Sequence, residues 1–175
     1  MNILSGVYKH APLKSPNDEK TRPMGSREKL ALFNMLTGEI EGKTVLDAFA
    51  GSGALGLEAL SRGAKSVVFV EKSKKVAEIL KENVKNVTKT SENTKIVVSS
   101  LENFETDEKF DLIFADPPYD SYSEALVRPL ERLLAKSGIL ALSLPKTAPS
   151  PVFEGLEPIS RRTYAAASII LFKKS

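Results

Sequence analysis

Residues 47–56, with the sequence DAFAGSGALG, give the strongest single indication of the architecture of this chain. They contain the pattern G-x-G-x-x-G at Gly51, Gly53 and Gly56, between an apolar segment and a helical pattern. Glycines in a strand-to-helix turn let backbone N–H groups approach a ligand closely, and α/β sheets bind ligands at the carboxyl ends of their strands. The pattern therefore predicts that these glycines form a nucleotide-type cofactor site, a tight turn without a ligand being the plainer alternative.

From residue 44 onward, short apolar runs alternate with helical patterns, which is typical of a parallel sheet covered by helices on both faces. Strands are expected at residues 44–49, 66–70, 95–98, 110–115 and 139–144, and helices at residues 54–62, 73–87 and 123–134. Ser73 is expected to cap the second of these helices, and Gly138 to form the turn into the fifth strand. The last segment, through residues 164–172, lacks a helical pattern and is expected to form a terminal hairpin. The predicted class is α/β.

Residues 1–43 follow a different pattern and are too few to form an independent domain. A strand-like start precedes a loop at residues 10–23 and a helix whose apolar side chains are Leu30, Leu32, Phe33 and Leu36. We therefore expect an N-terminal appendage at residues 1–43 and a main domain at residues 44–175. The part of the loop at residues 10–22 is expected to be mobile.

The composition of the 175-residue chain narrows its class. It is 42% hydrophobic and 27% charged, as soluble globular domains are, and has no cysteine and one histidine, so no metal site is expected. The start lacks a secretory signal pattern and no apolar run could span a bilayer, so no membrane partner and a cytoplasmic location are expected. The net charge of +3 is concentrated toward both ends around an acidic middle. That distribution fits a polyanionic partner or ordinary surface charge.

Two carboxylates narrow the choice of cofactor. Glu71 ends the second expected strand, where it can accept hydrogen bonds from ribose hydroxyls of a dinucleotide or of S-adenosylmethionine. Asp47 ends the first strand, where it would repel a pyrophosphate but could engage the ammonium of a methionine moiety, or cap the helix, or both. Ser100 could contact an adenine edge and Leu101 could pack on its ring, although such a turn is equally ordinary. The expected cofactor is S-adenosylmethionine.

The tetrapeptide Asp116-Pro117-Pro118-Tyr119 follows the apolar run at residues 110–115 and is expected to face the same crevice as the glycines. Methylating an aryl amine is difficult because its lone pair is delocalised, so the site must hold the nitrogen between acceptors. The Asp116 carboxylate and the Pro117 carbonyl can each accept an N–H, and the Pro-Pro backbone is rigid. Tyr119 can stack on a flat base presented outside a helix. A Pro-Pro turn alone is commonly only a turn, but beside a cofactor turn it predicts an amino-group methyltransferase.

These motifs resemble those of class I methyltransferases, and the chain as a whole resembles the bacterial 16S ribosomal RNA guanine-N2 methyltransferases of the RsmD type. The further matches are at residues 3–6, 21–23, 32–34 and 49–62. The resemblance implies a Rossmann-like fold with a seven-stranded, mostly parallel sheet and an antiparallel last strand. It also implies S-adenosylmethionine as cofactor and 16S ribosomal RNA of the assembling small subunit as partner. The sequence does not indicate an oligomeric state, and a monomer is the default expectation.

By the same resemblance, the appendage would form a lid over RNA and cofactor. Phe49, Arg22 and Pro23 join the expected cofactor contacts. The expected nucleic-acid contacts are Lys9, His10, Arg22 and Arg27. For the arginines, ordinary surface charge is the alternative.

Four other functions remain open. A DNA adenine-N6 or cytosine-N4 methyltransferase uses the same turn, but this chain leaves no domain to read base edges. A protein glutamine methyltransferase typically has Asn at the position of Asp116. A non-catalytic nucleic-acid or cofactor-binding module would bind without transferring a methyl group, and a nucleotide-dependent oxidoreductase would require nicotinamide.

Overall fold

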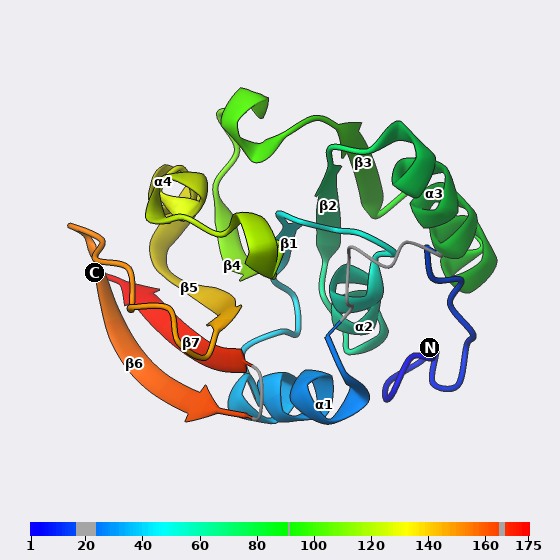
Figure 1. Cartoon of the computed structure of the whole chain (residues 1–175). Helices are drawn as coiled ribbons and strands as arrows, with labels where there is room; N and C mark the ends of the chain where they lie inside the picture. Colours follow the sequence, from blue (N-terminus) through cyan, green and yellow to red (C-terminus); the bar gives the residue numbers. More distant parts are fainter. Residues whose placement is uncertain (17–23, 91, 165–166) are drawn as a thin grey trace.

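The computed structural model describes residues 1–16, 24–90, 92–164 and 167–175. A seven-stranded sheet has the order β3-β2-β1-β4-β5-β7-β6. Its strands are β1 (Thr44–Asp47), β2 (Ser66–Glu71), β3 (Thr94–Val98), β4 (Phe110–Ala115), β5 (Leu134–Pro145), β6 (Leu156–Thr163) and β7 (Ala167–Lys174). The pairs from β3 to β5 are parallel, and β7 is antiparallel to both β5 and β6 (Figure 1). The predicted α/β class, the mostly parallel sheet and the antiparallel last strand are confirmed.

Helices cover both faces of this sheet. On one face lie α1 (Ser26–Met35), α2 (Ala54–Ser61) and α3 (Lys74–Thr88), and on the other lie α4 (Glu124–Val127), α5 (Leu130–Leu133) and the 3-10 turn η1 (Leu101–Asn103) (Figure 1). In β4, Leu112 and Phe114 join the first core while Ile113 and Ala115 join the second. Because successive side chains point to opposite faces, a strand buried on both sides is a continuous apolar run.

Several predicted bounds are wrong, for local reasons. The helix expected at residues 123–134 is two short helices, because Pro129 between them lacks an N–H and disfavours a continuous helix. β5 begins at Leu134 rather than at residue 139, with a register shift in its pairing to β4. The left-handed residue before its regular part is Ser137, at φ 60°, and not Gly138. β1 ends at Asp47, two residues earlier than expected.

Other local predictions are confirmed. The Ser73 side chain caps α3 by accepting a hydrogen bond from the Val76 N–H at 3.3 Å. The C-terminal hairpin is formed by β6 and β7.

Within the described ranges, no helix is long and apolar enough to cross a membrane. The loop expected to be mobile lies partly outside the described residues.

The N-terminal segment shares the core of the main domain. Ile3 and Leu13 join the same buried cluster as Leu32, Phe33 and Leu36 of the region around α1. Asn2 forms an isolated bridge with Pro12. The ring of Phe33 lies 5.5 Å from that of Phe114 on β4, so α1 is packed against the centre of the sheet.

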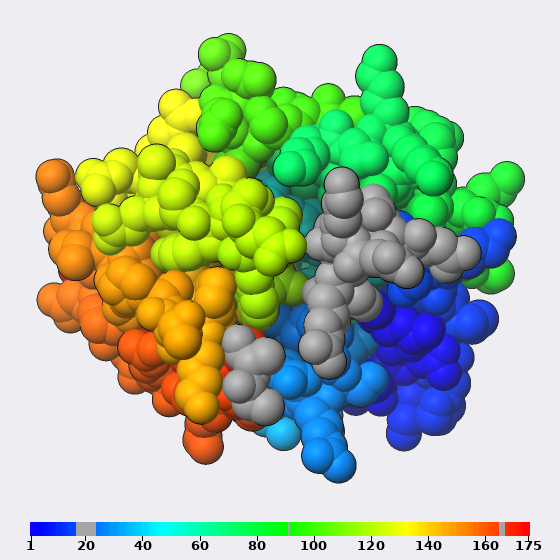
Figure 2. Space-filling view, in the orientation of Figure 1, coloured from blue at the N-terminus to red at the C-terminus, as the bar shows by residue number. Residues whose placement is uncertain are grey.

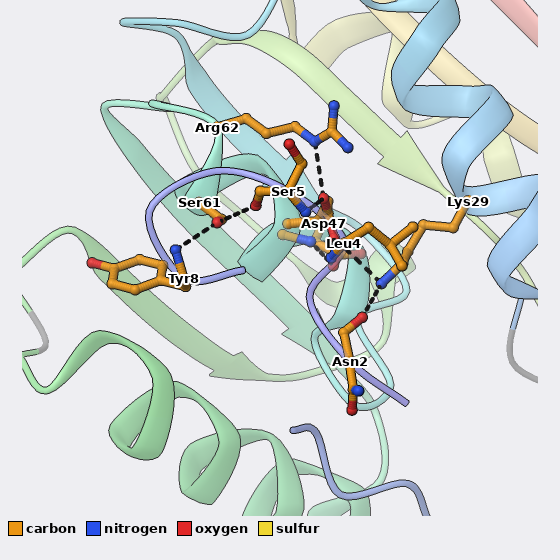
Figure 3. Close-up of polar contacts among 10 residues, drawn as sticks. Asn2, Leu4, Ser5, Tyr8, Lys29, Asp47, Ser61 and Arg62 are labelled. Carbon is orange, nitrogen blue, oxygen red and sulfur yellow. Dashed lines mark hydrogen bonds and ion pairs between the residues drawn. The ribbon is translucent and has the colours of Figure 1, made fainter. Parts of the chain in front are cut away.

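A buried ionic network fixes this segment to α2. Glu58 is fully buried and accepts hydrogen bonds from the backbone N–H groups of Leu4, at 2.7 Å, and Ser5, at 3.0 Å. Its carboxylate also pairs with Arg62 at 2.9 Å and with Lys29 of α1 at 3.4 Å. Figure 3 shows Leu4, Ser5, Lys29 and Arg62 converging from three separate parts of the chain.

Candidate active site

The glycine-rich turn lies at the carboxyl ends of β1 and β2. Gly51 and Gly53 have positive φ angles of 53° and 82°, which favour glycine. A Cβ added to Gly51 would meet nothing within 4 Å, so its backbone borders open space. The turn therefore offers an exposed backbone surface at the edge where such sheets bind ligands.

Gly53 and Gly56 are closely packed. A Cβ on Gly56 would lie 2.3 Å from Cε1 of Phe69, and a Cβ on Gly53 would lie 2.5 Å from Cδ1 of Leu80. Gly56 thus lets α2 approach β2 closely. Of the three glycines expected at a cofactor, Gly51 alone has an open Cα side.

Asp47 caps α2 from the end of β1. It is buried, with 2% of its surface exposed, and its Oδ2 accepts a hydrogen bond from the Gly56 N–H at 2.9 Å. Gly53, the N-cap residue, has no side chain to do this, so Asp47 supplies the missing acceptor. Burial, with added repulsion from Asp116 and Glu71, raises the pKa of Asp47 to about 7 against the opposing effect of the Gly56 hydrogen bond.

Glu71 joins two turns at the end of β2. Its Oε2 accepts a hydrogen bond from the Gly51 N–H at 2.9 Å, and its Oε1 accepts one from the Ser73 N–H at 2.8 Å. Each carboxylate oxygen has a further lone pair. Glu71 is therefore held in one orientation beside Gly51 and can still accept from a ligand.

The Asp116–Tyr119 turn follows β4 at the same edge. Asp116 is half-buried, and burial raises its pKa to about 6, although the Ser143 hydroxyl acts in the opposite direction. The Pro118 carbonyl accepts from the Ser121 N–H of η2 (Tyr119–Ser121), whereas the Pro117 carbonyl accepts no hydrogen bond from any described residue. Pro117 is buried, and its carbonyl is one acceptor of the turn that no described N–H occupies.

Ser143 of β5 belongs to the site and was missed by the sequence prediction. Its Oγ lies 2.7 Å from the Tyr119 hydroxyl, and its side chain is buried. Tyr119 itself keeps 38% of its surface exposed, and burial of its hydroxyl region, with the charge of Asp116, raises its pKa to about 12. A serine within an apolar strand has no motif that could have identified it.

A cavity of about 450 Å³ opens beside Tyr119. Its lining residues come from the segments after β4 and β5: Tyr119, Tyr122, Ser123, Glu124, Pro145, Thr147, Ala148 and Pro149. Figure 2 shows these two segments, yellow-green and orange, side by side on one face. The Tyr122 hydroxyl is buried and has no hydrogen-bond partner among the described residues. The cavity combines aromatic and proline surfaces with hydroxyl groups.

Asp47, Glu71 and Asp116 form a carboxylate cluster at the ends of β1, β2 and β4. The charges of Glu71 and Asp116 both act on Asp47, which places the three groups within electrostatic range. In the described part of the chain, no lysine or arginine forms an ion pair with any of them. The edge is therefore suited to a cation and unsuited to a pyrophosphate.

For the other predicted cofactor residues that it describes, the structure gives the burial but no polar contact with the glycine-rich turn. Phe49 is half-buried against the second core, Ser100 is half-buried at the start of η1, and Leu101 is buried within that core. Arg22 and Pro23 lie outside the described residues.

The predicted nucleic-acid contacts separate into two places. Arg27 is exposed in the first turn of α1, beside Glu28, whose charge acts on Tyr119. Lys9 and His10 are exposed near Ser61, at the far end of α2. Within the described ranges, no three acidic or histidine side chains group as metal ligands.

Comparison with known proteins agrees with this geometry. Residues 1–173 match the family described as conserved hypothetical protein 95. The chain is 41% identical to ribosomal RNA small subunit methyltransferase D of Haemophilus influenzae over 123 residues, which span 68% of this chain and 64% of that protein. It is 30% identical to the YlbH protein of Bacillus subtilis over 99% of both chains. The solved yhhF protein of Escherichia coli superposes with a TM-score of 0.86 at 27% identity, over 100% of this chain and 98% of that one. The chain therefore belongs to the family of RsmD-type class I methyltransferases.

Proposed function

We propose that this protein uses S-adenosylmethionine to methylate the exocyclic N2 amine of a guanine in 16S ribosomal RNA of the small ribosomal subunit. The observation that carries the proposal is the carboxylate cluster of Asp47, Glu71 and Asp116, which no described cation neutralises. S-adenosylmethionine carries an ammonium and a sulfonium, so it suits this cluster better than a dinucleotide does.

The residues at the crevice fit this cofactor. Glu71, oriented by two backbone N–H groups, would accept from the ribose hydroxyls, and Asp47 would act on the methionine ammonium. Gly51 would lie against the ligand, because nothing occupies the space beside its Cα. We assign Phe49, Ser100 and Leu101 to the adenosine side, and Arg22 and Pro23 to the same cofactor by family resemblance. The bound cofactor would supply a methyl group activated by the sulfonium.

The Asp116–Tyr119 turn would hold the acceptor amine. Asp116 and the Pro117 carbonyl would each accept one N–H, and so aim the nitrogen lone pair at the methyl group. Positioning of this kind can contribute roughly 7–11 kcal/mol in favourable cases. The half-exposed Tyr119 ring and the cavity beside it would receive the flat base once it is outside a helix.

The N-terminal appendage, residues 1–43, would act as a lid on the catalytic domain of residues 44–175. Asn83 of α3 ties Lys14 to the glycine-rich turn, because its Nδ2 donates to the carbonyls of Lys14 and Ser52, each at 2.9 Å. At the other side, Glu28 of α1 acts on Tyr119. These contacts support the assignment of the appendage as a lid. Arg27, and on family resemblance Arg22, Lys9 and His10, would contact RNA.

Methyl-labelled S-adenosylmethionine with a panel of acceptors tests this function. We expect label in the RNA of small ribosomal subunits and none in duplex DNA. Label in DNA alone would favour a DNA methyltransferase, and cofactor binding without transfer would favour a binding module. Asp116→Ala should abolish transfer and should weaken cofactor binding far less than it weakens transfer, because Asp116 is assigned to the acceptor amine. Asp120→Ala, which removes an exposed carboxylate of the same turn, is the matched control and should retain transfer.

A further inference from the structure

Ser143 joins two residues to which the proposed function gives different tasks. Its side chain is 2% exposed on β5, and its Oγ is 2.7 Å from the Tyr119 hydroxyl. The same side chain also acts on Asp116, because it lowers the pKa of that carboxyl as a hydrogen-bond donor does. A single buried serine therefore adjoins both the expected amine acceptor and the expected stacking residue.

The chemistry of the three groups decides which of them donates. An ionised carboxylate can only accept, so Ser143 acts on Asp116 by offering its one proton. Ser143 then has no proton left for Tyr119, and the Tyr119 hydroxyl must donate to Ser143. Tyr119 therefore donates to Ser143, and Ser143 donates toward Asp116.

From this geometry we infer that Ser143 is a positioning residue, whose hydroxyl fixes the Asp116 carboxylate and the Tyr119 ring in the arrangement that receives the acceptor amine. The inference rests on the proposed function and extends it to a residue outside the Asp116–Tyr119 turn. Ser143 touches neither the cofactor nor the amine in this account.

The surroundings make this one hydroxyl important. The charges of Asp116 and Asp47 repel each other, and the charge of Glu28 of α1 acts on Tyr119, so these neighbouring charges are negative. None of these carboxylates can donate a hydrogen bond when ionised. Removal of the Ser143 hydroxyl would leave Asp116 without this donor among like charges, and would leave the Tyr119 hydroxyl without its acceptor.

The matched pair Ser143→Thr and Ser143→Val tests the inference, because the two side chains share a shape suited to a strand and differ in the hydroxyl. We expect Ser143→Val to lower kcat by about ten-fold to a hundred-fold, as loss of a hydrogen bond to a charged group does. Its acid limb in the pH–rate profile should move to higher pH, and the KM for S-adenosylmethionine should not change. Ser143→Thr should restore much of kcat and the original acid limb. Equal kcat and equal acid limbs in the two variants would overturn the inference.

Two further measurements separate the possible failures. Tyr119→Phe keeps the ring and removes its hydroxyl, so it should raise the KM for the acceptor RNA and leave the acid limb in place. If the unaltered protein transfers no methyl group, the proposed function fails, and the Asp116 carboxyl is then titrated by carbon-13 NMR in the Thr and Val variants. A higher Asp116 pKa in Ser143→Val supports the hydrogen bond independently of activity, and identical titrations would refute it.

Discussion

Replacing Glu58 with alanine should remove a large part of the free energy that stabilises this domain. Glu58 is fully buried, and its carboxylate accepts from the Leu4 and Ser5 N–H groups and pairs with Lys29 and Arg62. Lys29 is only 2% exposed, and its other hydrogen bond is to the Asn2 carbonyl at 2.9 Å. Burial lowers the pKa of Lys29, and the Glu58 charge opposes that shift. The alanine variant would leave this buried ammonium without a carboxylate.

Breaking a buried ion pair by removing one partner costs about 3–5 kcal/mol. The total free energy of unfolding of a native domain is only about 5–15 kcal/mol. The expected loss in Glu58→Ala is therefore about 3–5 kcal/mol, measured as the free energy of unfolding in urea at neutral pH. Glu58→Gln keeps the size and one oxygen acceptor, so it should lose less.

The double variant Lys29→Met with Glu58→Ala removes the stranded charge and should recover part of the lost stability, since it takes away both ions. A loss below about 1 kcal/mol in Glu58→Ala would refute the reasoning, because it would mean that Lys29 finds water or another partner at no cost.

Three further predictions follow from individual contacts. Gly56→Ala would place its Cβ 2.3 Å from the Phe69 ring, so it should lose about 1–3 kcal/mol in a urea titration, and an unchanged unfolding curve would contradict the packing role. The pKa values of Asp47, about 7, and Asp116, about 6, are raised by folding, so their contribution to stability is complete below about pH 4 and is lost as pH rises through 6 and 7. Thermal melts of the ligand-free protein should show that loss of stability. Over the same rise in pH, calorimetry should show tighter binding of S-adenosylmethionine. An affinity that does not change with pH would argue against recognition of the cation by these carboxylates. Glu71→Gln should weaken cofactor binding about ten-fold without changing kcat at saturation, because a charged acceptor becomes neutral; unaltered affinity would remove Glu71 from the cofactor site.

The architecture could be predicted from the sequence because the patterns that indicate it are local. Glycines between a strand and a helix, and a double proline after an apolar run, have meanings set by their immediate neighbours. The break at Pro129 also had a local signal, which the apolar helical pattern around it concealed.

Residues that act through distant partners could not be predicted in this way. Ser143 is one polar residue in a buried strand, and its role depends on Tyr119, 24 positions away. Glu58 lies in a helix where a carboxylate would ordinarily face solvent, and its partners Leu4 and Ser5 are more than 50 positions away. Gly56 matched a cofactor motif, but its contact with Phe69 shows that it permits close packing of α2 on β2.

The identity of the methylated nucleoside tests the proposed chemistry most directly. Small ribosomal subunits are incubated with the protein and S-adenosylmethionine, and their RNA is digested to nucleosides and analysed by mass spectrometry. The account predicts N2-methylguanosine as the product, absent when Asp116 is replaced by alanine. Methylation of an adenine or cytosine amine, or N2-methylguanosine formed undiminished by the Asp116→Ala protein, would contradict it.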